Sequence, residues 1–237
     1  MELKVIVPTS LSEITLDQYQ RFARLEGDEE FLTHKMLEIF CGVPLAELPN
    51  VKFASVANVM RHINTMFSEK PNLKTEFTIG GEAYGFIPNL EDITFGEYVD
   101  LDNYMGDVQE LHKTMAVLYR PITERIGKRY AIEPYESASK YSASMKDAPM
   151  DVVMGASVFF YHLGNELLHA TLTSLEKETT NTPPSPNSEE SGDGILPSIS
   201  LLKEMLQDLK ELDGLAFTKP LPFSFLRKSA STLNVNN

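Results

Sequence analysis

The residues best suited to chemistry in this chain are two histidines and a glutamate near residue 165. His162, Glu166 and His169 are spaced i, i+4 and i+7, which puts all three on one face of a helix. A di-metal site in a helical bundle needs a second Glu-x-x-His pair from another helix, and a zincin needs His-Glu-x-x-His; the sequence contains neither. We therefore expect these three side chains to be hydrogen-bonded or to lie at the solvent edge of the helix, without a metal. A metal-dependent enzyme is the least favoured function.

A calcium loop starting at Asp100 is the second candidate. Asp100, Asp102 and Asp107 supply carboxylates close together. In the register of an EF-hand loop, however, Tyr104 stands where an oxygen ligand is required, and Leu111 stands where the bidentate glutamate should be. The pattern favours a solvated loop or the start of a helix.

The remaining polar groups can also be explained without catalysis. Cys41 lies in the apolar string EIFCGVP, which keeps a thiol protonated and indicates a core residue. The acidic pairs Glu91–Asp92 and Glu97–Asp100 are typical of helix first turns, where carboxylates favour the helix dipole. We expect a protein that is not an enzyme and that binds no metal and no cofactor.

Charge is distributed unevenly along the chain. The net charge is −13, and residues 214–237 carry Lys219, Arg227 and Lys228 with no acidic residue, so residues 1–213 carry −16. An acidic body repels the phosphate backbone of nucleic acid, whose binding depends on cationic side chains. We expect neither nucleic acid nor an anionic membrane surface as a partner.

Apolar runs are too short to predict a membrane segment. The longest, residues 152–163, falls well below the roughly 20 residues that span a bilayer. The apolar run at the N-terminus is likewise too short for a signal-peptide core. A buried helix and a cytosolic setting are the expectations.

The first 70 residues predict a strand and three helices in one layer. Residues 1–10 have the composition of a first strand. Thr15 with Gln18 matches a capping box that opens a helix ending near residue 27; Asp28 caps a second helix that Gly42 stops, and a third begins at Ser55.

The middle of the chain predicts a hairpin and then helices. Residues 75–86 alternate with period 2 around Gly80-Gly81, which sets Phe77 opposite Tyr84 in an antiparallel hairpin. Thr94 with Glu97 opens a short helix. A longer helix follows over residues 108–126, which Pro121 should kink or split. Asp147 and Pro149 have the pattern of the cap and first turn of the strongest helix, roughly residues 149–178. The fold class expected is α+β, mainly α, with a small antiparallel β-hairpin sheet.

Composition changes abruptly at residue 179. We predict a mainly helical domain over residues 1–178, a flexible linker over 179–194, and a C-terminal amphipathic helix and tail over 195–237. The apolar side chains of this last segment are the predicted partner-binding residues, with two readings open: the helix enters a groove of another protein, or it covers its own domain. The residues are Leu202, Leu206, Leu209, Phe223 and Phe225.

Five stretches over roughly residues 3–178 carry a family resemblance: ITLDQYQRF, HKMLEIFCGV, YGFIPNLEDITFGEYVDLDNY, LHKTMAVLYRPI followed by IEPY, and MDVVMGASVFFYHLGNELL. They resemble a family of proteins encoded among the tail genes of tailed bacteriophages, described as tail assembly chaperones or tail and baseplate assembly proteins. No functional residue carries over from these strings.

The resemblance implies a non-enzymatic assembly factor that binds other phage tail proteins, the tape measure or the tube, in the host cytoplasm. The alternative is a minor structural protein of the tail, baseplate or neck that stays in the virion. A homo-oligomer is left open. The acidic body suits the first role, because like charge keeps complexes with an aggregation-prone cargo soluble.

Overall fold

The computed structural model describes residues 6–181, and residues 1–5 and 182–237 lie outside the described range. The described residues fall into two compact units, residues 6–156 and residues 157–181. The fold is α+β and mainly α with a small antiparallel sheet, as predicted, but the sheet has four strands where the sequence predicted a single hairpin. The predicted linker, C-terminal helix and tail lie outside the described residues, apart from the first three positions of the linker, which continue the last helix to Asn181.

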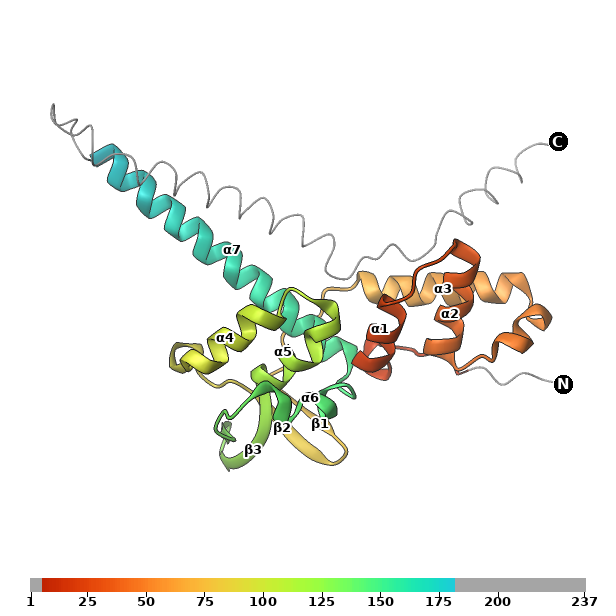
Figure 1. The fold of residues 1–237 in the computed structure, drawn as a ribbon, viewed down its shortest axis with the longest axis horizontal. Coiled ribbons are helices and arrows are strands. Elements are labelled where there is room, and N and C mark those ends of the chain that lie inside the picture. Colours follow the sequence, from red (N-terminus) through yellow and green to blue (C-terminus); the bar gives the residue numbers. More distant parts are fainter. Residues whose placement is uncertain (1–5, 182–237) are drawn as a thin grey trace. The chain divides into compact units, whose positions relative to one another are not determined.

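Three helices form the N-terminal part of the first unit (Figure 1): α1 (Leu16–Ala23), α2 (Glu29–Cys41) and α3 (Phe53–Ser68). Short 3-10 helices, η1 (Leu11–Glu13) and η2 (Leu45–Asn50), precede α1 and α3. Aromatic rings from all three helices meet in the core, with centroids 5.4–5.8 Å apart for neighbouring pairs among Tyr19, Phe22, Phe40 and Phe67. Such contacts bury large apolar areas and fix the helices against each other.

The ends of these helices follow the sequence signals closely. Thr15 and Gln18 form both halves of the predicted capping box. The Asp28 carboxylate accepts a hydrogen bond from the backbone N–H of Phe31, and Gly42 ends α2 in the left-handed conformation (φ 65°), which costs glycine no steric strain. The third helix starts at Phe53, two residues before the predicted Ser55.

The sheet has the order β1-β2-β3-β4, from β1 (Glu76–Ile79), β2 (Glu82–Phe86), β3 (Tyr119–Ile126) and β4 (Arg129–Ile132). The first hairpin has the predicted register, with Phe77 opposite Tyr84. Gly80 and Gly81 both have positive φ, as a two-residue turn of this kind requires. The ring of Tyr119 lies 5.0 Å from that of Phe77, which joins the strands through an aromatic cluster.

The predicted helix over residues 108–126 is wrong in its second half. After η4 (Val108–Glu110), α5 runs only from Leu111 to Leu118, and the chain then enters β3. Pro121 cannot continue a helix, and β3 pairs with β2 instead, placing Tyr119 opposite Phe86. Strand pairing between β2 and β3 therefore outweighs the helical spacing of the apolar residues in this segment.

The predicted first strand is also absent from the part of it that the structure describes. Residues 6–10 form no strand, and Ile6 is exposed. Pro8 has no N–H to give to a sheet, and its carbonyl is instead 3.0 Å from Nε2 of His62. The first five residues of this prediction lie outside the described range.

The remaining helices of the first unit are η3 (Leu90–Asp92), α4 (Phe95–Tyr104), η5 (Ala138–Lys140), α6 (Ser142–Met145) and the start of α7 (Met150–Asn181). The predicted helix over 149–178 is thus confirmed, but it begins at Met150, so the residue before it is Pro149 and the predicted cap at Asp147 is wrong. Its residues 150–156 are almost all buried, and at Gly155 a Cβ would lie 2.5 Å from the carbonyl oxygen of Asn72, so only glycine permits this close approach. Among the described residues, no helix has the length and apolarity that a membrane crossing requires.

Candidate functional site

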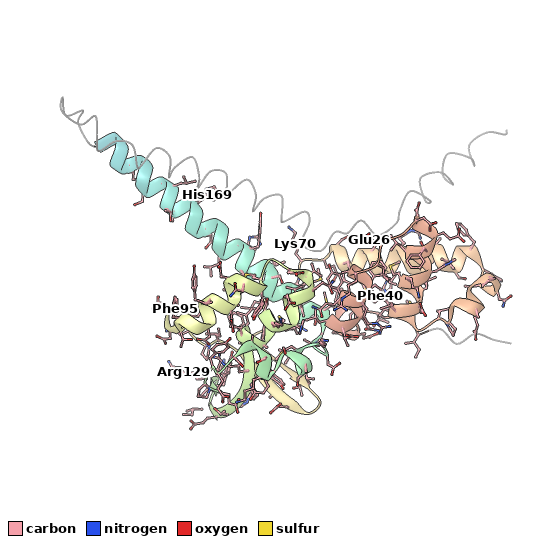
Figure 2. The ribbon with its side chains drawn as sticks, viewed as in Figure 1. Glu26, Phe40, Lys70, Phe95, Arg129 and His169 are labelled. Atoms are coloured by element: carbon pink, nitrogen blue, oxygen red, sulfur yellow. The ribbon has the colours of Figure 1, made fainter. Side chains whose placement is uncertain are left out.

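The metal candidate on α7 is not assembled into a binding group. His162, Glu166 and His169 are all exposed on the helix, and Figure 2 labels His169 along its length. Within residues 6–181, no group of three or more His, Cys, Asp or Glu residues is placed to hold a metal ion. The spacing along one helix supplies a shared face and no ligands from a second element.

The aspartates of the calcium candidate are engaged separately. Asp100 accepts a hydrogen bond from the hydroxyl of Tyr135. Asp107 accepts one from the backbone N–H of Gln109 at 2.8 Å and so caps η4. Asp102 points to the exposed side of α4. The three carboxylates therefore have separate environments and do not form a common calcium site.

Cys41 is a core residue, as predicted, because its side chain is buried between α2 and its neighbours. Burial raises the pKa of its thiol to about 11. A thiol with this pKa is protonated at neutral pH, and the thiolate is the nucleophilic form.

Among the described residues, a hollow lies on the β3–β4 hairpin, and one of its lining residues, Arg129, is labelled in Figure 2. Its volume is about 140 Å³, below the roughly 300 Å³ at which small-molecule pockets begin. The other lining residues are Glu124, Ile126, Tyr130 and Ala131. The hollow is therefore smaller than the pockets that usually bind small molecules.

A buried ion pair between Glu97 and Arg120 attaches α4 to the sheet. The sequence predicted the capping role of Glu97 but not its pairing with Arg120. The predicted capping box is present: the hydroxyl of Thr94 accepts from the backbone N–H of Glu97 at 3.3 Å, and Oε2 of Glu97 accepts from the backbone N–H of Thr94 at 2.7 Å. The other oxygen, Oε1, accepts from Nη1 of Arg120 on β3. Both side chains of this ion pair are buried, so one carboxylate caps the helix and fixes it to the sheet.

The charge state of Glu97 follows from its surroundings. Burial by itself would raise the pKa of this carboxyl, but hydrogen bonds from Thr94 and the guanidinium of Arg120 outweigh burial and lower it. The Arg120 guanidinium also lies over the ring of Tyr135, 5.5 Å from its centroid. Burial, together with the nearby Asp100 carboxylate, raises the pKa of Tyr135. Both shifts move the pKa of Glu97 and of Tyr135 away from neutral pH, whereas acid–base catalysis needs a pKa near the working pH.

The opposite side of α4 carries apolar side chains into solvent. Phe95 is 81% exposed and Tyr98 is 61% exposed. Their spacing, continued by Val99, Asp102 and Met105, defines one helical stripe, which we call the α4 face (Phe95, Tyr98, Val99, Asp102, Met105). Figure 2 labels Phe95, the first residue of α4.

This grouping distinguishes the α4 face from other exposed apolar side chains. Four of the eight large hydrophobic residues that are exposed in the described range lie on it. The others, Ile6, Phe31, Phe53 and Ile126, are on separate elements. Scattered apolar residues are normal on a surface, whereas grouped ones indicate a contact site.

The sequence around α4 is acidic. Residues 75–112 contain nine Asp or Glu and neither Lys nor Arg. Of these, Glu91, Asp92, Asp102 and Asp107 are exposed on α4 or beside its ends. The nearest cation in sequence after them, Lys113, pairs with Glu110 and lies 4.7 Å from the ring centroid of Tyr104. The α4 face is therefore an apolar stripe that includes Asp102, and further exposed carboxylates lie close to the ends of α4 in sequence.

The sequence-predicted binding residues, Leu202, Leu206, Leu209, Phe223 and Phe225, lie outside the described residues. Comparison with family models, with curated proteins and with solved structures gave no match to this chain. The fold and the α4 face are therefore the basis on which a function can be argued.

Proposed function

We propose that this chain is a non-enzymatic assembly factor for bacteriophage tails, similar to a tail assembly chaperone, and that it binds a tape-measure or tube protein through the α4 face. The observation that carries the proposal is the grouping of Phe95 and Tyr98 on the outside of a helix whose inside is fixed by a buried ion pair. The phage setting comes from the sequence resemblance alone. The chemistry of the surface supports the protein-binding role.

The energetics favour a contact at this face. Fully burying one large apolar side chain stabilises a contact by about 1.5–3 kcal/mol, and Phe95 keeps most of its surface in water. Aromatic residues are enriched in the centres of protein interfaces. Two of them on one helical stripe can supply the centre of such an interface, with the carboxylates as its polar rim.

Preorganisation adds to this support. The capping box and the Arg120–Glu97 pair hold α4 in a defined position on the sheet. The ring of Tyr135 lies below Gly96, with carbon atoms 3.7–3.9 Å from where a Cβ would be, so the first turn of α4 is supported from below. A partner therefore meets a rigid stripe, and less conformational entropy is lost on binding.

The test is co-purification of the full chain with a tape-measure or tube protein expressed from the same tail gene cluster. We expect the double variant Phe95→Ser/Tyr98→Ser to lose at least about tenfold in affinity, which corresponds to about 1.4 kcal/mol. The matched control is Ile126→Ser, which removes an equally exposed apolar residue (71%) on β3.

Equal binding by the double variant and the wild-type chain would contradict the role of the α4 face. Mass spectrometry of finished particles addresses the phage role separately. A factor that dissociates is absent from the virion, and stoichiometric copies there would instead support the alternative of a minor structural protein.

A further inference from the structure

We propose that the chain's own C-terminal tail, residues 214–237, covers the α4 face within the same molecule until a protein partner displaces it. This contact goes beyond the proposed function, because it requires no foreign protein. The occupant is argued from charge, from side-chain chemistry and from the length of chain that joins the two segments.

Charge complementarity is the first support. The tail carries Lys219, Arg227 and Lys228 and no acidic residue, whereas residues 75–112 carry nine acidic residues and neither Lys nor Arg. Three of the nine acidic residues, Glu76, Glu97 and Glu110, already pair with Arg125, Arg120 and Lys113. Complementary charges set the orientation and the choice of partner in a contact, and Asp92 and Asp102 are exposed to receive the cations.

The apolar side chains of the tail match the α4 face as well. The tail reads FTKPLPFSFLRK from Phe217 onward. Phe223 and Phe225 are two residues apart, so an extended segment presents both to the same side, and Pro220 and Pro222 restrict the backbone before them toward extended conformations. Extended proline-containing segments bind to aromatic surfaces with little loss of conformational entropy, and Phe95 and Tyr98 provide such a surface.

The connecting chain is long enough. From Asn181, where α7 ends, to Phe217 there are 36 residue steps, which span up to roughly 120 Å when fully extended. A helical conformation over residues 195–212, as the sequence analysis expects, would leave roughly 85 Å. Both exceed the roughly 48 Å length of the 32-residue α7. A tethered segment of this kind has an effective concentration of the order of millimolar, so a weak intrinsic affinity is enough for occupancy.

A fluorescent reporter can test this contact, because the chain contains no tryptophan. In the full chain, Tyr98→Trp places a single indole on the α4 face. We expect blue-shifted emission and low acrylamide quenching with the native tail. Adding Phe223→Ser/Phe225→Ser should shift the emission to the red and raise quenching several-fold. The control reporter Ile126→Trp, on β3, should respond to neither tail change.

Three results would overturn the proposal. The first is an indole at residue 98 that is equally accessible to acrylamide with the native and the altered tail. The second is a blue shift that disappears on dilution, which would show a second copy of the chain as the occupant. The third is an identical response of the control reporter, which would indicate a change throughout the fold.

Zero-length cross-linking of the wild-type full chain gives an independent readout. A carbodiimide activates a carboxylate, and a lysine amine then displaces the urea to form an amide. We expect amides that join Lys219 or Lys228 to Asp92 or Asp102, and in a mixture of ¹⁴N- and ¹⁵N-labelled chains each cross-linked pair should carry one isotope only. Mixed-isotope pairs, or no pair between these segments, would contradict the intramolecular contact. Both experiments use the purified chain alone, so their outcome is separate from that of the partner-binding test.

Discussion

Helices α1 and α4 begin with the same local signal and end in opposite environments. Each opens with a threonine and a capping partner three residues later, Gln18 in α1 and Glu97 in α4. The first residue of α1, Leu16, is fully buried, whereas the first residue of α4, Phe95, is 81% exposed. The fourth residue of each helix is a tyrosine, buried in α1 and exposed in α4. Local sequence therefore sets where a helix begins, and tertiary contacts decide which of its faces is covered.

The capping partners show how each helix is attached. In α1 the neutral Gln18 donates from Nε2 to the carbonyl of Ile39 at 2.9 Å, and apolar burial supplies the rest. In α4 the charged Glu97 pairs with Arg120. The buried side of α4 is thus held by the Glu97–Arg120 ion pair, and its apolar residues Phe95 and Tyr98 lie on the exposed side.

Breaking the charged attachment should have the largest effect. Arg120→Met leaves the carboxylate of Glu97 buried without its cation, and we expect a loss of about 3–5 kcal/mol in the free energy of unfolding. Urea denaturation followed by circular dichroism measures it. The double variant Glu97→Gln/Arg120→Met gives α4 the neutral capping box of α1 and should recover most of the loss. A single-variant loss of about 1 kcal/mol or less, as for a surface pair, would contradict the role given to this ion pair.

Truncating the first residue of each helix should give the second-largest effect on the free energy of unfolding, and the effect should differ between α1 and α4. Leu16→Ala removes a fully buried side chain and should cost about 2–5 kcal/mol. Phe95→Ala, at the equivalent position of α4, should cost no more than about 1 kcal/mol, because Phe95 is exposed on its own domain and its proposed contact with the tail is weak. The same urea titrations measure both. Similar losses for the two variants would show that the α4 face belongs to the core.

The smallest expected effect is a pH dependence that α4 has and α1 lacks. The pKa of Glu97 in the folded chain lies below its ordinary value near 4.5, because hydrogen bonds from Thr94 and Arg120 outweigh burial. Its contribution to stability is therefore fully present above that ordinary value and declines as pH falls from it toward the folded pKa. Gln18 does not titrate.

Unfolding free energies of the wild-type chain and of Glu97→Gln/Arg120→Met, measured from pH 7 down through pH 4, isolate this contribution. The difference between the two should shrink as the pH falls. A difference that stays constant through this range would show that Glu97 has the same pKa in the folded and unfolded chains.

The sequence predicted those features that depend on neighbours along the chain. The caps at Thr15, Asp28 and Thr94 depend on residues three positions away, and the glycine turn fixed the register of β1 and β2. Local physics is sufficient at these places, because the interacting groups are close together in sequence.

Features that depend on distant residues were missed. The stripe from Val108 to Ile126 resembles a helix, and only pairing with β2 converts its second half into a strand. Arg120 was consequently not recognised as the partner of Glu97. An arginine between Tyr119 and Pro121, directly after an apolar run, was the available signal, because a buried cation requires a buried anion. The exposure of the α4 face could not be predicted, since α1 has an equivalent pattern and is buried.

The buried state of Cys41 has a practical consequence. It is the only cysteine in the chain, its side chain is enclosed, and its pKa of about 11 keeps the thiol protonated in neutral buffer. Maleimide dyes and spin labels react with thiolates that they can reach. Cys41 should therefore not react with these labels in the folded chain. A cysteine introduced on the surface would then be the single site that is labelled.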